Sequence, residues 1–183
     1  MHAADIEADL QRVLFTSDQL ATRVEEIAAQ IDADYAGEQI LLVGVLNGAM
    51  MVMADLARAL KIHCAVDWMA VSSYGSGTKT SGVVQILKDL STDIADKHVL
   101  IVEDIVDTGL TLSYLKQNLQ SRGPASVEIM AMFSKPECLT ADVDVKYIGF
   151  ELPDEFVVGY GLDYAGRYRN LCDLGTLAPH VYS

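Results

Sequence analysis

The sequence predicts an α/β protein whose core is a mostly parallel, twisted sheet flanked by helices. Two observations support this fold class. A strand–helix–strand pattern occurs twice, over residues 41–72 and over residues 99–133. The expected strands are short continuous apolar runs, such as LLVGVL at 41–46, which are typical of strands buried on both faces of a parallel sheet. Parallel neighbours need a crossover connection, and a helix normally supplies it.

The N-terminal part of the chain predicts two helices before the first strand. Residues 5–14 have the pattern of a short amphipathic helix. Thr16 and Gln19 have the spacing of a capping box, so a second helix is expected to begin after Thr16. Apolar residues then recur with a helical period, at Leu20, Val24, Ile27, Ala28 and Ile31.

The remaining elements continue the alternation of strands and helices. We expect helices at 47–61 and at about 110–122, the second closed by Gly123 and Pro124. Strands are expected at 64–73, 83–88, 99–102 and 126–133, with a polar loop at 74–82. The chain after residue 134 predicts short strands and turns.

Composition indicates one folded domain, because 51% of the 183 residues are hydrophobic and 21% are charged. The net charge of -13 argues against a nucleic-acid surface, which needs a basic stripe. The apolar segment 40–46 is too short to cross a bilayer, and the N-terminus lacks the features of a signal peptide. Three widely spaced cysteines predict reduced thiols. We therefore expect a cytoplasmic protein that binds neither nucleic acid nor membranes.

The stretch VLIVEDIVDTGLTL at 99–112 is the strongest candidate for a functional site. Ligands of open parallel sheets bind beyond the carboxyl ends of the strands, where Glu103, Asp104 and Asp107 are expected. The start of the following helix suits a phosphate group, and Gly109 lets the backbone approach it closely. Carboxylates suit sugar hydroxyls or Mg²⁺, and Asp107 can accept a proton. Helix capping alone explains one Asp–Thr pair but not three carboxylates within five residues.

Two other motifs are excluded by their context. VLIVED resembles the first strand of a phosphoacceptor receiver domain, but there the acidic pair opens the domain, whereas here it lies past the middle of the chain. GSGTKT at 75–80 resembles a P-loop, yet Thr78 separates Gly77 from Lys79, and a strand rather than a helix follows.

The acidic stretch resembles the phosphoribosyl pyrophosphate motif of type I phosphoribosyltransferases. Four further segments resemble the bacterial hypoxanthine(-guanine) phosphoribosyltransferases: VLNGAM at 45–50, VSSYGSGTKTSG at 71–82, FSKPE at 133–137 and GFELPDEFVVGYGLDYAGRYRN at 149–170. The resemblance covers residues 10–178. It implies the type I phosphoribosyltransferase fold and a role in purine salvage. The implied reaction transfers 5-phosphoribosyl from phosphoribosyl pyrophosphate to N9 of hypoxanthine or guanine, giving IMP or GMP and pyrophosphate.

The resemblance also assigns the sugar and phosphate contacts. It implies that Asp107 is the general base near purine N7. The implied phosphoribosyl-binding residues are Glu103, Asp104, Asp107, Thr108, Gly109, Leu110 and Thr111. The implied pyrophosphate-binding residues are Leu46, Asn47, Gly48 and Arg169, and family members often have a cis peptide bond that corresponds to Leu46-Asn47.

The purine and metal contacts are likewise implied by the resemblance. Lys135 is implied to contact the purine 6-oxo group, and Phe156, Val157 and Asp163 complete the purine site. The implied cofactor is Mg²⁺, with Glu103, Asp104 and Asp163 as ligands. Ser73 and Tyr74 would begin a flexible loop that closes over the site.

The implied organisation is a single phosphoribosyltransferase domain over residues 1–183, with a core at about 35–150. A small hood is expected from the N-terminal helix and residues from about 151 to 183, with the mobile active-site loop at about 73–83. The implied partners are the small-molecule substrates and further copies of the chain, as a dimer or a tetramer.

Four residues depart from the family pattern: Asn47, Ala165, Gly166 and Asn170. Asn47 stands where many members carry Lys or Arg, and the other three replace residues that are often acidic. These departures leave the local metal and pyrophosphate geometry open. Two alternatives to the implied activity also stay open: a regulatory or binding protein on the same fold, and a xanthine-preferring enzyme. Asp107, Lys135 and Phe156 favour an enzyme, because regulators tend to lose such contacts.

Overall fold

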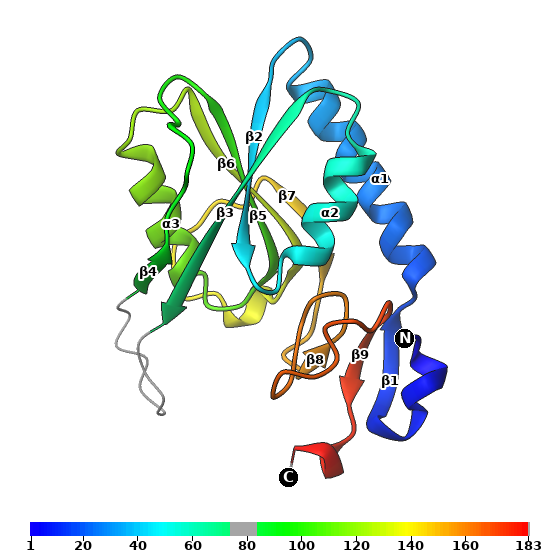
Figure 1. The fold of residues 1–183 in the computed structure, drawn as a ribbon. Helices are drawn as coiled ribbons and strands as arrows, with labels where there is room; N and C mark the ends of the chain where they lie inside the picture. The colour runs from blue at the N-terminus through cyan, green and yellow to red at the C-terminus, as the bar shows by residue number, and fades with distance from the viewer. Residues whose placement is uncertain (74–83, 183) are drawn as a thin grey trace.

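The computed structural model describes residues 1–73 and 84–182 and contains two sheets. The larger sheet has six strands in the order β4-β3-β2-β5-β6-β7 (Figure 1). Its strands are β2 (Ile40–Leu46), β3 (Cys64–Ser73), β4 (Val84–Lys88), β5 (His98–Val106), β6 (Ser126–Ser134) and β7 (Tyr147–Glu151). Every neighbouring pair is parallel except β3 and β4, which are antiparallel. The predicted mostly parallel sheet is confirmed.

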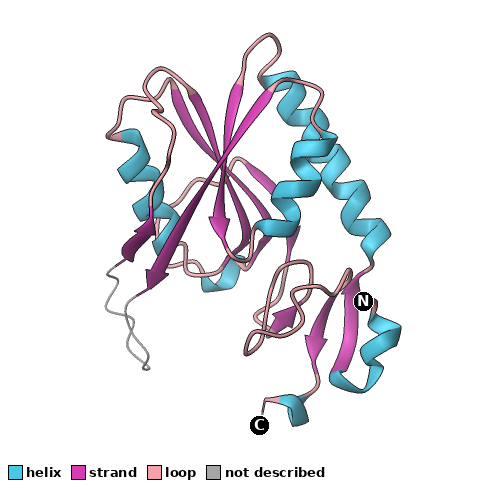
Figure 2. Cartoon of the chain, in the orientation of Figure 1, coloured by secondary structure: helices cyan, strands magenta, loops and turns pink. Residues whose placement is uncertain are grey.

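Helices cover both faces of this sheet, as Figure 2 shows. Helices α1 (Ser17–Asp34) and α2 (Met50–Ala59) pack on one face, where Leu42, Leu100 and Met130 are fully or almost fully buried. Helix α3 (Leu110–Gln120) packs on the other face. Because both faces are buried, β2 reads as the uninterrupted apolar run ILLVGVL.

The N-terminus differs from the expected helix at 5–14, and that prediction is wrong. A 3-10 helix covers Ala3–Asp9, and β1 covers Leu10–Phe15. The reason is pairing with a distant segment, because β1 lies antiparallel to β9 (Leu174–Leu177). The next prediction is confirmed: helix α1 begins after Thr16, whose side chain and that of Gln19 form the reciprocal capping box.

The smaller sheet has the strand order β1-β9-β8, with β8 at Val157–Val158. We call this sheet and the segment 152–173 the hood. The hood lies beyond the carboxyl ends of the large sheet's strands (Figure 1). Two short 3-10 helices, Pro136–Cys138 and Pro179–Val181, complete the described elements.

Two boundaries differ from the sequence-based expectation by three residues or more. Strand β5 continues to Val106 instead of ending at residue 102, and α2 begins at Met50 instead of residue 47. Ser73 ends β3, whereas Tyr74 and the rest of the loop expected at about 73–83 lie outside the described residues. Across residues 1–73 and 84–182, the structure contains no helix that is both long and apolar enough to span a membrane.

Candidate active site

Glu103 and Asp104, the acidic pair, lie within the last residues of β5 and not after the strand, as had been expected. Hydrogen bonding to β6 continues from Glu103, opposite Ala131, to Val106, opposite Ser134. This pairing holds the backbone of both acidic residues in a rigid strand. Rigid strands position side chains more accurately than loops do, so the carboxylates have a defined place at the edge of the sheet.

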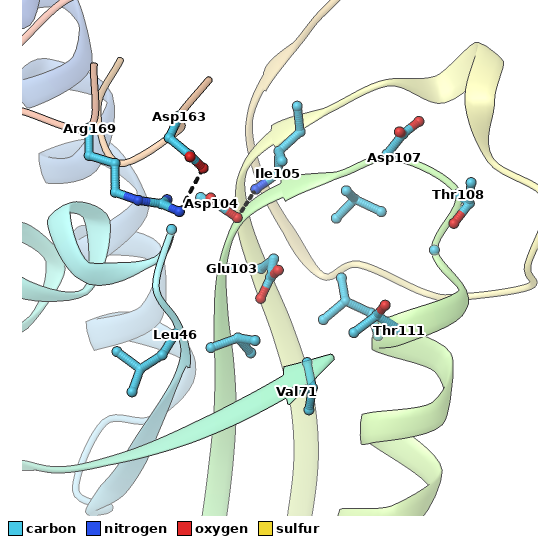
Figure 3. A pocket seen from close by; sticks show the side chains of 15 residues that line it. Leu46, Val71, Glu103, Asp104, Ile105, Asp107, Thr108, Thr111, Asp163 and Arg169 are labelled. Carbon is cyan, nitrogen blue, oxygen red and sulfur yellow. Dashed lines mark hydrogen bonds and ion pairs between the residues drawn. The ribbon is translucent and has the colours of Figure 1, made fainter. Parts of the chain in front are cut away.

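A cavity of about 340 Å³ opens at this edge (Figure 3). The acidic pair and the turn after β5 form most of its wall. Leu46 contributes from the end of β2, Gly48 from the loop after it, and Asp163 and Arg169 from the hood. Among the described residues, the lining is Val45, Leu46, Gly48, Val71, Glu103, Asp104, Ile105, Val106, Asp107, Thr108, Gly109, Thr111, Leu112, Asp163 and Arg169.

Asp104 is buried and has little hydrogen bonding to balance its charge. Its Oδ1 accepts a hydrogen bond of 2.8 Å from the backbone N–H of Ile105. Burial raises the pKa of Asp104 to about 6, although the nearby Arg169 guanidinium acts in the opposite direction. A side chain at Gly48 would overlap the Asp104 carboxylate, so only glycine fits there. The loop after β2 therefore lies directly against this acid.

Glu103 has an unsatisfied carboxylate oxygen. Its Oε2 is buried and, among the described residues, has no hydrogen-bond partner. Burial, together with the charge of Asp104, raises the pKa of Glu103 well above its usual value. A buried oxygen without a partner costs free energy, which a cation or a ligand hydroxyl at this position would recover.

The turn from Asp107 to Thr111 leads into α3. Gly109 is the N-cap residue with φ of 77°, a left-handed conformation that glycine adopts readily. A Cβ atom there would lie 2.8 Å from Val143 Cγ1, so the side chain is also excluded by packing. Glycine offers no capping side chain, and the N–H of Leu110 has only a long hydrogen bond of 3.5 Å to Thr108 Oγ1. The first turn of α3 can therefore donate to an anion.

A second cavity of about 240 Å³ adjoins the first. Its lining consists of Asp104, Ile105, Asp107, Lys135, Phe156, Val157, Leu162, Asp163 and Arg169. Five of these residues also line the first cavity: Asp104, Ile105, Asp107, Asp163 and Arg169. The two cavities therefore meet at the end of β5. The structure brings the predicted phosphate and purine residues to one place.

Lys135 and Phe156 provide the distinctive groups of the second cavity. The Lys135 side chain is only 11% exposed, and its Nζ lies 3.5 Å from Asp154 Oδ1. Phe156 is 49% exposed, and its ring packs against Tyr164 and Tyr182 at centroid distances of 5.6 and 6.0 Å. A buried ammonium and an open aromatic face can together bind a planar polar ring.

Arg169 is oriented by two contacts within the hood. Its Nη2 lies 2.6 Å from Asp163 Oδ1, and its Nη1 donates to the Gly161 carbonyl oxygen at 2.6 Å. Both contacts leave the guanidinium beside Asp104, at the junction of the cavities (Figure 3). An oriented guanidinium suits a phosphate oxygen.

Some expected site residues lie outside the cavity walls. Asn47 and Leu110 line neither cavity, although the Leu46-Asn47 peptide bond is cis, as the resemblance implied. Val71, Asp154 and Leu162 were not anticipated. All three lie in segments that carry the family resemblance, but no role was assigned to them there. Val71 and Leu162 are apolar, and Asp154 meets Lys135 only through folding.

The parallel sheet, the acidic pair at the carboxyl end of β5 and the covering hood agree with the phosphoribosyltransferase fold that the resemblance implied. Residues 14–165 match the family model described as phosphoribosyl transferase domain. A hypoxanthine-guanine phosphoribosyltransferase of Mycobacterium bovis is 50% identical over 180 residues, covering 95% of this chain and 89% of that protein. One from Staphylococcus aureus is 48% identical over 175 residues, covering 96% and 98%.

Solved structures agree with this assignment. A crystal structure of a hypoxanthine phosphoribosyltransferase from Staphylococcus aureus superposes with a TM-score of 0.95 at 47% identity, covering 98% of this chain and 97% of that one. The chain therefore belongs to the phosphoribosyltransferase family and, within it, to the hypoxanthine-guanine phosphoribosyltransferases.

Proposed function

We propose that the chain transfers the 5-phosphoribosyl group of phosphoribosyl pyrophosphate to N9 of hypoxanthine or guanine in purine salvage. The observation that carries this proposal is the junction of the two cavities at Asp104, Asp107 and Arg169. One cavity has the chemistry for a sugar phosphate and the other for a purine. Their meeting point is where a bond between the two substrates would form.

The proposed reaction forms the N9–C1′ bond and breaks the bond from C1′ to the pyrophosphate oxygen, with inversion at C1′. The transition state has oxocarbenium character, so positioning and charge stabilisation matter more than covalent catalysis. Asp107 is proposed to take a proton from the purine at N7, because it borders both cavities. Pyrophosphate is proposed to leave beside Gly48 and Arg169, because both residues line the first cavity and a guanidinium suits a phosphate oxygen.

Lys135 is proposed to select 6-oxopurines. Its buried ammonium can only donate hydrogen bonds, and hypoxanthine and guanine present an acceptor at position 6. Adenine presents an amino donor there, and two donors cannot form a hydrogen bond with each other, so we expect strong rejection of adenine. Phe156 is proposed to stack on the purine, and its exposed ring supports this role.

Mg²⁺ is the proposed cofactor, and the residues present fit it. The unpartnered Glu103 oxygen and Asp104 offer the hard oxygen ligands that this ion prefers. Asp163 is the third proposed ligand, and its carboxylate is paired with Arg169 and Gly166 in this structure. In the described parts of the chain no three metal-binding side chains gather into a complete site. Mg²⁺ is commonly held by one or two carboxylates together with substrate phosphates, which agrees with such an incomplete set. When bound, it neutralises charge that develops on the departing pyrophosphate.

The proposed setting is the cytoplasm, and the proposed assembly is a homo-oligomer. The three cysteines are unpaired, as expected in a reducing compartment.

Val66 and Leu87 are apolar side chains that are 46% and 64% exposed on the strands at one edge of the large sheet. Burial against a second copy would remove this surface from water. Sedimentation of the purified chain distinguishes a monomer from a dimer or a tetramer.

The proposed activity is tested by steady-state assays with phosphoribosyl pyrophosphate, Mg²⁺ and each of hypoxanthine, guanine, xanthine and adenine. We expect IMP and GMP with stoichiometric pyrophosphate, and no adenine product. Lys135→Met should raise KM for the base. Lys116→Met is the control: it removes a lysine on α3 that is also largely buried, and it should leave this KM unchanged. No turnover with any 6-oxopurine would favour a binding or regulatory protein instead.

A further inference from the structure

The segment Gly159–Tyr160–Gly161 connects β8 to the hood residues that border the active site. Its three residues all have left-handed backbone conformations, with φ of 103°, 48° and 101°. Glycine adopts such angles readily, but a bulky residue such as tyrosine rarely does. A residue keeps such a conformation only when its surroundings hold it there. The contacts of Tyr160 therefore show what fixes this part of the hood.

Tyr160 is anchored in the core and to helix α2. Its side chain is only 8% exposed, and its ring lies edge-on to Phe133 at a centroid distance of 6.4 Å. Its hydroxyl donates a hydrogen bond of 2.7 Å to Asp55 Oδ2 on α2. Burial and the neighbouring Asp55 carboxylate raise the pKa of Tyr160, so the phenol keeps its proton and remains the donor.

Helix α2 directly follows the loop after β2, which carries Gly48. Gly161 packs against that loop so closely that a Cβ atom would overlap the Gly48 carbonyl oxygen. The backbone N–H of Gly161 donates to the Arg169 carbonyl at 3.1 Å, and the Gly161 carbonyl accepts from Arg169 Nη1. A continuous series of contacts therefore joins the loop after β2, Gly161 and Arg169.

We propose that the hydrogen bond from Tyr160 to Asp55 is a latch that positions the hood over the loop after β2. The latch fixes the spacing between Arg169 and Gly48 and thereby supports binding of phosphoribosyl pyrophosphate. Tyr160 and Asp55 line neither active-site cavity, so they act as positioning residues and not as catalytic ones. This inference rests on the proposed function.

The latch makes a selective prediction, because Lys135 and Phe156 contact neither Tyr160 nor Asp55 through a hydrogen bond or ion pair in the described chain. In Tyr160→Phe we expect KM for phosphoribosyl pyrophosphate to rise about fivefold, which corresponds to losing the roughly 1 kcal/mol of one hydrogen bond from the arrangement that binds this substrate. KM for hypoxanthine should change less than about twofold. In the reverse reaction, KM for pyrophosphate should rise by a similar factor to KM for phosphoribosyl pyrophosphate.

Tyr147→Phe is the matched control. Tyr147 is 3% exposed, and its hydroxyl also donates 2.7 Å to a helix carboxylate, Asp34 Oδ2, but it lies in β7 away from both cavities. This variant should lose a similar amount of stability and leave both KM values unchanged. Equal changes of the two KM values in Tyr160→Phe, or no change in either, would overturn the latch.

A second variant covers the possibility that Tyr160→Phe folds poorly. Asp55→Ala removes the other partner, and the double variant should raise KM for phosphoribosyl pyrophosphate no further than either single one. Arg58→Ala is a control: it removes the ion pair between the exposed Arg58 side chain and Asp55, and it should leave KM for phosphoribosyl pyrophosphate unchanged. Multiplicative effects in the double variant would refute the latch. Inactive wild-type protein would instead refute the proposed function, so the two failures are distinguishable.

Discussion

At the scale of single residues, the site separates acids by their surroundings. Asp104 and Glu103 are held in a buried strand end, and burial raises the pKa of both. Asp107 lies on the following turn and is exposed to solvent, yet it borders both cavities. These three carboxylates are therefore suited to different tasks. Glu103 and Asp104 are suited to bind ligand hydroxyls or Mg²⁺, and Asp107 is suited to accept a proton.

Asp107→Asn tests the proton-transfer role. The amide cannot accept the purine proton, so kcat should fall by about 10²–10⁴-fold. Because Asp107 is exposed, the melting temperature should change little. The measurement is steady-state turnover of hypoxanthine beside a thermal melt. Asp144→Asn, at another exposed carboxylate outside both cavities, should be fully active. An active Asp107→Asn enzyme would remove this residue from the mechanism.

Asp104→Asn should stabilise the ligand-free protein in a pH-dependent way. Since the native pKa of about 6 exceeds the usual value of 3.8, the native state retains a proton that the unfolded state loses as pH rises between these values. The wild type therefore loses stability over that interval, and the asparagine variant does not. We expect the variant to be more stable by roughly 1–3 kcal/mol at pH 8, with the difference vanishing below pH 4. Urea unfolding from pH 4 to pH 8 measures it.

Asp67→Asn is the opposite control. Asp67 is equally buried, but backbone N–H groups of Trp68, Ser91 and Thr92 donate to its carboxylate at 2.8 to 2.9 Å. Although burial opposes them, these bonds lower the pKa of Asp67. Its charge stabilises the fold above pH 4, and this contribution is lost as pH falls through the lowered pKa. Asp67→Asn should therefore destabilise at pH 8. The same sign for both variants would contradict our account of the buried acids.

At the scale of elements, local signals predicted what local interactions determine. The capping box of Thr16 and Gln19 correctly placed the start of α1, and the apolar run at 41–46 correctly gave β2. The expected helix at 5–14 failed because β1 is defined by pairing with β9, about 160 residues further along the chain. The length of β5 likewise depends on its pairing with β6.

Site residues divide in the same way. The resemblance supplied those in motifs, such as Asp107 and Lys135, because motifs are contiguous in sequence. Asp154 meets Lys135 where the hood packs against the end of β6, and Tyr160 meets Asp55 where the hood packs against helix α2. Neither pairing has a periodicity or spacing that could predict it.

Gly48→Ala tests the contact between the loop after β2 and strand β5. The added methyl group would overlap the Asp104 carboxylate, so the loop must move. We expect a stability loss of about 1–3 kcal/mol and a substantial fall in kcat/KM for phosphoribosyl pyrophosphate. Gly123→Ala is the control: φ is 73° there and the space is open, so it should cost about 1 kcal/mol and leave activity intact. Wild-type activity in Gly48→Ala would show that the contact does not position the loop.

At the scale of the whole molecule, the net charge of -13 opposes a polyanionic substrate. Local groups must therefore overcome the long-range repulsion: the guanidinium of Arg169, the first N–H groups of α3 and a divalent cation. We expect turnover to depend strongly on Mg²⁺ and to be lost in excess chelator, then restored by added Mg²⁺. Turnover that persists in chelator would contradict this balance of charges.

The central claim is that a sugar phosphate binds where β5 gives way to α3, with the purine beside Lys135 and Phe156. A crystal structure of the protein with bound IMP tests it most directly. The account predicts the phosphate at the turn 107–111 and the 6-oxo group within hydrogen-bonding distance of Lys135 Nζ. A phosphate bound elsewhere, or a purine outside the cavity of Phe156, would contradict it.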